Sequence, residues 1–158
     1  MNGVVELSAS NHVGALHALE SLSQLFRFDF ARERHYMPQD CKITDRPRFP
    51  HRGLLMDTAR HFLPVSFIKR VIDSLRMNKL NVLHWHLTEW QSWPYRSDVF
   101  PEISAAGAWS DSEQYTVSEL RYLVDYAAKR GIRIMAELDQ PGHMGALLKK
   151  ILKNISGN

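Results

Sequence analysis

The chain has 158 residues, of which 44% are hydrophobic and 23% charged, a composition typical of a globular protein of about one domain. This excludes a disordered tail, a collagen-like repeat and, with Cys41 as the single cysteine, a disulfide scaffold. The net charge is only +3, no lysine or arginine stripe carries interleaved aromatics, and no apolar run is long enough for a membrane helix, so neither a nucleic-acid partner nor a membrane segment is expected.

The first 50 residues differ in pattern from the rest. Apolar side chains recur at helical spacing from Asn11 to Phe26, and Asn11 is a plausible N-cap. The stretch from Ala31 to Pro50 is polar and rich in arginine, which predicts a strand or loop followed by a linker. Residues 1–30 lack the charged start and apolar core of a signal peptide, so no signal peptide is expected in this chain.

After Pro50 the pattern alternates between strands and helices. Three apolar runs predict strands, at Gly53–Asp57, Leu80–Leu87 and Ile132–Asp139. Helical spacing follows each of them, beginning at Pro64, at a Thr116–Glu119 capping box and at Ala146, the last helix running to Leu152. Residues 88–115 form a long loop.

The order strand, helix, strand, helix, strand, helix predicts parallel strands with right-handed crossovers. Three such units fit either an open doubly wound sheet or part of a barrel. No glycine-rich phosphate-binding motif follows any of the predicted strands, which argues against a doubly wound sheet that binds a nucleotide.

Each predicted strand ends in polar residues. The three groups are Asp57, Arg60 and His61; His84, His86, Thr88 and Glu89; and Glu137, Asp139 and His143. The carboxyl ends of parallel strands form the ligand face of such folds, so these groups predict one functional site.

Two features of this region have alternative interpretations. His84 and His86 share one strand face and could bind a metal with Asp57 or Asp139, but a hydrogen-bonded interior pair fits better because no third ligand is clearly placed. The aromatic residues Trp85, Trp90, Trp93, Tyr95 and Trp109 suit either a core or stacking on sugar rings.

Four segments resemble the family 20 β-N-acetylhexosaminidases, in that family's order and spacing. Residues 14–25 are similar to a helix of the family's small N-terminal domain. The other three resemble the first three barrel strands and are His51–His61, Asn78–Leu87 and Ala136–His143. The resemblance implies an α/β fold, a partial TIM (β/α)8 barrel at residues 51–158 preceded by the end of a small α+β domain at residues 1–50.

The resemblance also implies a function. Family enzymes remove terminal N-acetylglucosamine or N-acetylgalactosamine with retention, the substrate's own 2-acetamido oxygen attacking the anomeric carbon while a Glu protonates the leaving oxygen. The implied partners are glycans ending in these sugars, with no cofactor and no metal. A secreted or lysosomal or vacuolar location is implied for the full-length protein, and the resemblance leaves open whether that protein is a homodimer.

Individual residues match family positions. Arg52 matches an arginine that grips sugar hydroxyls, with pairing to Asp57 as the structural alternative. Asp57 and Arg60 match charged residues of the pocket floor. Glu89 and His143 match residues that support the general acid.

Asp139 is expected to orient the loop that carries His143. Trp90 departs from the family, which usually has an acidic or amide residue at that edge of the substrate pocket. The family's catalytic Asp-Glu pair has no counterpart up to residue 158, so the sequence predicts a fragment that is inactive alone. A non-catalytic glycan-binding relative and a metal-dependent barrel hydrolase remain the alternatives.

Overall fold

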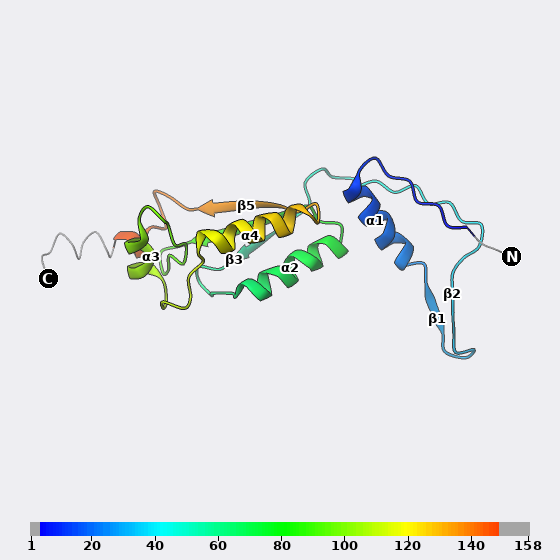
Figure 1. Cartoon of the computed structure of the whole chain (residues 1–158), viewed down its shortest axis with the longest axis horizontal. Helices are drawn as coiled ribbons and strands as arrows, with labels where there is room; N and C mark the ends of the chain where they lie inside the picture. Colours follow the sequence, from blue (N-terminus) through cyan, green and yellow to red (C-terminus); the bar gives the residue numbers. More distant parts are fainter. Residues whose placement is uncertain (1–3, 149–158) are drawn as a thin grey trace, which may run out of the picture. The chain divides into compact units, whose positions relative to one another are not determined.

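The chain is described by a computed structural model over residues 4–148. It divides at Pro50 into two compact units, one on each side of that residue. Figure 1 labels the helices and strands in chain order.

The first unit consists of a helix and a hairpin. Helix α1 spans His12–Ser23, and Asn11 caps it by accepting a hydrogen bond from the Gly14 backbone N–H. Strands β1 (Arg27–Asp29) and β2 (Arg34–Tyr36) pair in antiparallel register. The predicted N-cap is therefore confirmed, whereas the hairpin was not expected, because its strands are too short to show alternation.

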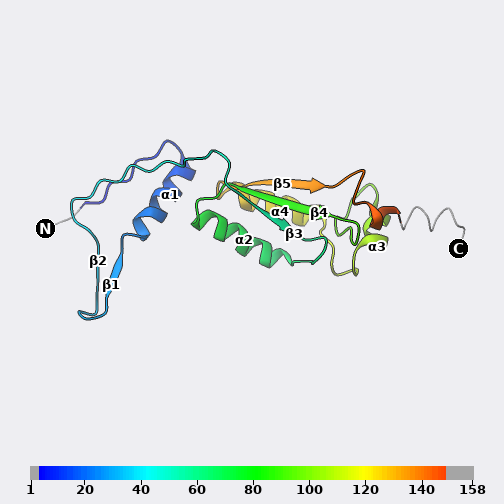
Figure 2. The ribbon, with the colours of Figure 1, turned by 180° about the vertical axis from the view of Figure 1, so that it is seen from behind.

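The second unit is built on a parallel sheet in the order β3, β4, β5, which span Gly53–Asp57, Val82–Thr88 and Arg133–Leu138. Helices α2 (Val65–Met77) and α4 (Val117–Ala128) connect these strands. Figures 1 and 2 look from opposite sides and show both helices against the same face of the sheet. This is the arrangement of consecutive barrel units, with the other face toward the barrel interior.

Local sequence explains where these helices begin and end. Thr116 and Glu119 form the predicted capping box, each side chain bonding the other's backbone N–H. Helix α4 ends before Gly131, whose φ of 73° lies in the left-handed region that glycine adopts without strain. The predicted long loop contains a short helix, α3 (Pro101–Gly107), which the sequence pattern did not indicate.

The core lies between the helices and their side of the sheet. Alternate residues of β4 point into it, including Leu83 and Trp85, which are almost fully buried. Tyr115 stacks on Phe62 and packs edge-on against Trp85. Burial raises the pKa of Tyr115 to about 12, so its hydroxyl remains a donor, to the Leu63 carbonyl.

The predicted strands agree with the observed ones to within two residues at each end. Part of the predicted helix Ala146–Leu152 lies outside the described residues. Among those described, no helix has both the length and the apolar character needed to cross a membrane.

Candidate functional site

The site lies on the interior face and at the carboxyl ends of the three parallel strands. The sheet register sets Asp57, His86 and Glu137 side by side on neighbouring strands. Because side chains alternate along a strand, these three share the face opposite the hydrophobic core. Asp57, His86 and Glu137 therefore form a polar row where the barrel interior begins.

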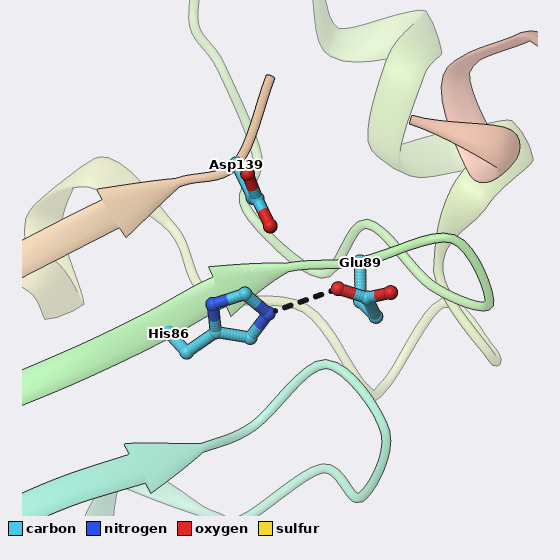
Figure 3. A group of neighbouring side chains, drawn as sticks. All are labelled: His86, Glu89 and Asp139. Carbon is cyan, nitrogen blue, oxygen red and sulfur yellow. Dashed lines mark hydrogen bonds and ion pairs between the residues drawn. The ribbon is translucent and has the colours of Figure 1, made fainter. Parts of the chain in front are cut away.

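A chain of alternating carboxylates and imidazoles runs through this row. Glu137 Oε2 lies 3.0 Å from His86 Nδ1, and His86 Nε2 lies 3.1 Å from Glu89 Oε2. The other oxygen, Glu89 Oε1, lies 2.5 Å from His143 Nδ1. Figure 3 shows His86 and Glu89 joined in this way, with Asp139 on the neighbouring strand end. His84 Nε2 also bonds Glu137 Oε2, at 2.5 Å.

The charge on His86 follows from its partners. Carboxylates only accept hydrogen bonds, so both ring nitrogens of His86 must donate, which requires the imidazolium form. Burial alone would lower the pKa of His86, but the bonds to Glu137 and Glu89 outweigh it and raise that pKa. The same contacts lower the pKa of Glu137, in which the bond from His86 is the largest cause.

Glu89 is the hub of the site. Its side chain is only 3% exposed, and burial alone would raise its pKa. Hydrogen bonds from His143, the Trp90 backbone N–H and His86, together with the charge of Arg60, instead hold the pKa of Glu89 at about 2. Glu89 is therefore a permanent anion, and its contact raises the pKa of His143.

Arg60 and Asp57 form the other side of the site. Arg60 Nη1 lies 2.5 Å from Asp57 Oδ2, and Nη2 lies 3.2 Å from Glu89 Oε1. Burial alone would raise the pKa of Asp57, but the bonds from Arg60 and from the Ala59 backbone lower it. The Arg60 side chain stays 44% exposed, so part of the guanidinium fork remains open to a ligand.

His143 has a second acidic neighbour. Its Nε2 lies 4.0 Å from Asp139 Oδ2, while the Asp139 backbone N–H donates to Thr88 Oγ1 at 3.2 Å. The φ of His143 is 56°, an uncommon conformation for a non-glycine residue and one found at functional sites. The structure thus brings Glu89, Asp139 and His143 together.

The structure does not bring Arg52 to this group. Arg52 precedes β3 at its amino end, where its Nε donates to the Lys79 carbonyl oxygen at 2.8 Å. Its backbone N–H donates to Asn81 Oδ1, also at 2.8 Å. Asp57 is paired with Arg60 instead. Arg52 precedes the strand and Arg60 follows it, so Arg60 is the arginine at the carboxyl end, where the site lies.

The sequence placed His86 and Glu137 in the groups of polar residues at the strand ends, but it did not predict that they contact each other. Glu137 links His84 to His86, and His86 links Glu137 to Glu89. The two-residue spacing of the histidines, with a glutamate on the next parallel strand, was the available signal. Trp90 follows Glu89 at the end of β4 and is 55% exposed.

A metal ion fits this group poorly. One ligand atom each from His86, Glu89 and Asp139 lies within 4.8 Å of the others. His86 as an imidazolium has no lone pair to offer, however, and the Arg60 guanidinium already occupies the space beside Glu89. The arrangement suits an organic ligand with hydroxyl groups better than a cation.

Comparison with known proteins gives a consistent result. Residues 49–157 match the family model described as Glycosyl hydrolase family 20, catalytic domain. The chain is 47% identical over 140 residues to the beta-hexosaminidase subunit beta of Mus musculus, covering 89% of this chain and 26% of the relative. It is 45% identical over 139 residues to beta-hexosaminidase 3 of Arabidopsis thaliana, covering 87% and 26%. The chain thus spans about a quarter of the length of the curated relatives it matches.

Solved structures agree. A Flavobacterium johnsoniae chitobiase matches with a TM-score of 0.80 and 41% identity, over 89% of this chain and 21% of that one. An exo beta-N-acetylglucosaminidase from Vibrio harveyi, solved with N-acetylglucosamine, matches with a TM-score of 0.75 and 35% identity, over 89% and 24%. The predicted α/β fold and partial barrel are confirmed by these matches and by the parallel sheet.

Proposed function

The chain belongs to glycosyl hydrolase family 20, and we propose that the full-length protein that carries it releases terminal N-acetylglucosamine or N-acetylgalactosamine units from glycans. The observation that carries this proposal is the charged group at the strand ends, in which Arg60, Glu89 and His143 are joined by ion pairs. Such a group can hold sugar hydroxyls and fix a proton-donating side chain at the same time.

Arg60 is the sugar-binding arginine in this proposal. Its fork is anchored by Asp57 and Glu89 and is 44% exposed, so it is held in one orientation with donors to spare. A planar fork held by two carboxylates suits a pair of adjacent hydroxyls better than a lysine ammonium does.

Glu89 and His143 are positioning residues. His143 Nδ1 donates to the anionic Glu89, which fixes the orientation of the imidazole ring. In the family resemblance, His143 stands beside the glutamic acid that protonates the leaving oxygen. An imidazolium fixed there would steady that acid's geometry, while the substrate's acetamido oxygen acts as nucleophile.

The remaining parts of the proposal follow from family membership. Residues 1–50 are the end of the small N-terminal domain, supported by the helix and hairpin of that unit. The partners are glycans ending in N-acetylhexosamine, and the location is secreted or lysosomal or vacuolar.

The test is hydrolysis of an aryl β-N-acetylglucosaminide and the matching galactosaminide by the full-length protein. Release of the aryl group from either, with the β-anomer of the sugar as first product, is expected. Binding of the sugar without turnover would instead favour a non-catalytic glycan-binding relative.

A further inference from the structure

Trp90 combines a fixed backbone with an open side chain. Its backbone N–H donates to the carboxylate of Glu89, which is itself almost fully buried. The Trp90 side chain is nevertheless 55% exposed, whereas Trp85 and Trp93 are 1% and 8% exposed and belong to the interior. Trp90 is therefore set at the rim of the site rather than in the core.

One face of the Trp90 indole is covered by Gly145. A methyl group on Gly145 would lie 2.3 Å from Cδ2 of Trp90, 2.5 Å from Cε2 and 2.7 Å from Cγ. Cδ2 is a ring-fusion carbon surrounded by ring atoms in the plane, so another atom can approach it so closely only from above or below that plane. Gly145 thus lies flat against one face, and any larger residue there would displace the ring.

The exposed area of Trp90 must come from the other face and the edges. An aromatic ring that is backed on one side and open on the other is suited to stacking against a flat apolar surface. The less polar face of a pyranose ring is such a surface. Arg60, the sugar-binding arginine of the proposed function, follows the neighbouring strand at the same end of the sheet, so Trp90 lies at the sugar-binding end.

We propose that Trp90, backed by Gly145, is a specificity-determining platform on which the sugar unit on the leaving-group side of the cleaved bond stacks. This inference rests on the proposed function. It assigns the leaving-group side because Trp90 directly follows Glu89, and Gly145 directly follows the loop of His143, the histidine expected beside the acid that protonates the leaving oxygen. The enzyme would then favour oligosaccharides over glycosides with a small leaving group.

The experiment compares two substrates of the full-length protein. One is the β-linked disaccharide of N-acetylglucosamine, and the other is methyl β-N-acetylglucosaminide, whose methyl leaving group offers nothing to stack. In Trp90→Ala, the ratio of kcat/KM for the disaccharide to that for the methyl glycoside should fall about threefold to tenfold, the range of a single ring-stacking contact. Trp90→Phe should recover most of that ratio.

Gly145 supplies the second arm. Gly145→Ala should also lower the ratio of kcat/KM for the disaccharide to that for the methyl glycoside, because the added methyl group would displace the Trp90 indole. In a Trp90→Ala background, Gly145→Ala should have no further effect, since the ring is already gone. The matched control is Gly142→Ala in the same loop, where an added methyl group meets no atom of residues 4–148 within 4 Å. It should leave the ratio unchanged.

Three outcomes would overturn the proposal. An unchanged ratio in Trp90→Ala, with the wild type hydrolysing both substrates, would remove the platform while leaving the proposed function intact. A lowered melting temperature in Trp90→Ala with equal losses on both substrates would mean that the indole packs against another part of the full-length protein. If the wild type hydrolyses neither substrate, the proposed function fails first, and the platform on which this reaction depends fails with it.

Discussion

Two arginines flank strand β3, and they have different surroundings. Arg52 at the amino end donates its Nε to the Lys79 backbone carbonyl, in the turn between α2 and β4. Arg60 beyond the carboxyl end bonds two carboxylates, Asp57 and Glu89, and stays partly open to solvent. One arginine ties the backbone together, and the other helps to form a charged site.

The difference shows how a parallel α/β sheet divides its tasks. Residues at the amino ends of the strands hold the turns, while residues at the carboxyl ends carry the chemistry. Both arginines lie in a single resembling segment, His51–His61, but the strand between them puts Arg52 at the amino end and Arg60 beyond the carboxyl end.

The largest expected effect is at the centre of the carboxyl end. Glu89→Gln removes the anion that His86, His143 and Arg60 share. If His143 supports the general acid, kcat for an aryl β-N-acetylglucosaminide should fall by about a hundredfold or more, toward the range of general acid catalysis. Steady-state kinetics of the full-length variant measure this.

A structural control separates catalysis from stability. Asp73→Asn on α2 weakens a similar set of contacts, with Tyr126 on α4 and with Arg130 just after that helix, on the opposite face of the sheet. This variant should lower the melting temperature and keep kcat. If Asp73→Asn and Glu89→Gln lowered kcat equally, the division between the two regions would be wrong.

The second prediction compares the two arginines directly. Arg60→Lys keeps the charge but loses the fork that contacts two carboxylates, so kcat/KM should fall at least about tenfold. Arg52→Lys loses the bond from Nε to Lys79, so it should lower the melting temperature and leave kcat/KM unchanged.

This reverses the expectation from sequence, which assigned the sugar contact to Arg52. Kinetics and thermal unfolding of both variants decide between the two assignments. A tenfold loss of kcat/KM in Arg52→Lys, with Arg60→Lys close to wild type, would restore the original assignment.

The third prediction concerns pH. The pKa of Glu89 is lowered from 4.5 to about 2, so its contribution to stability is present above about pH 4.5 and is lost as the pH falls toward 2. The pKa values of His86 and His143 are raised above 6.5, so their contribution is complete below pH 6.5 and is lost as the pH rises through those raised values.

Both contributions overlap between about pH 4.5 and 6.5. The melting temperature of the wild type should therefore exceed that of Glu89→Gln by the largest margin, about a few degrees, in that window. The margin should shrink on both sides of it. A margin that stays constant from pH 6.5 up to pH 9 would contradict the raised pKa values of the two histidines.

Much of this architecture could be predicted from the sequence, because its signals are local. The capping box at Thr116 and the apolar runs of β3 and β4 are patterns of neighbouring residues. The helix and strands predicted from them are confirmed by the structure. The three groups of polar residues at the strand ends are also visible in sequence, since each follows an apolar run.

The partnerships within the site could not be predicted in the same way. The link from Glu137 through His86 to Glu89 depends on the register of β4 against β5, which no local pattern fixes. The contact of Gly145 with Trp90 depends on where a loop folds back. Both are long-range features, because Glu137 and His86, like Gly145 and Trp90, are more than fifty positions apart in the sequence.

The smallest expected effect is that of metal removal. A metal centre at His86, Glu89 and Asp139 would break the comparison between the two ends of the sheet, because the carboxyl end would then be organised by a cation. To bind there, a divalent ion would have to displace the proton on His86 Nε2 and also the Arg60 guanidinium beside Glu89. Dialysis of the full-length protein against a chelator should therefore leave kcat/KM unchanged, and added zinc should not raise it. Loss of activity on chelation with recovery on zinc addition would favour the metal-dependent hydrolase, and Arg60 would then have to move away from Glu89.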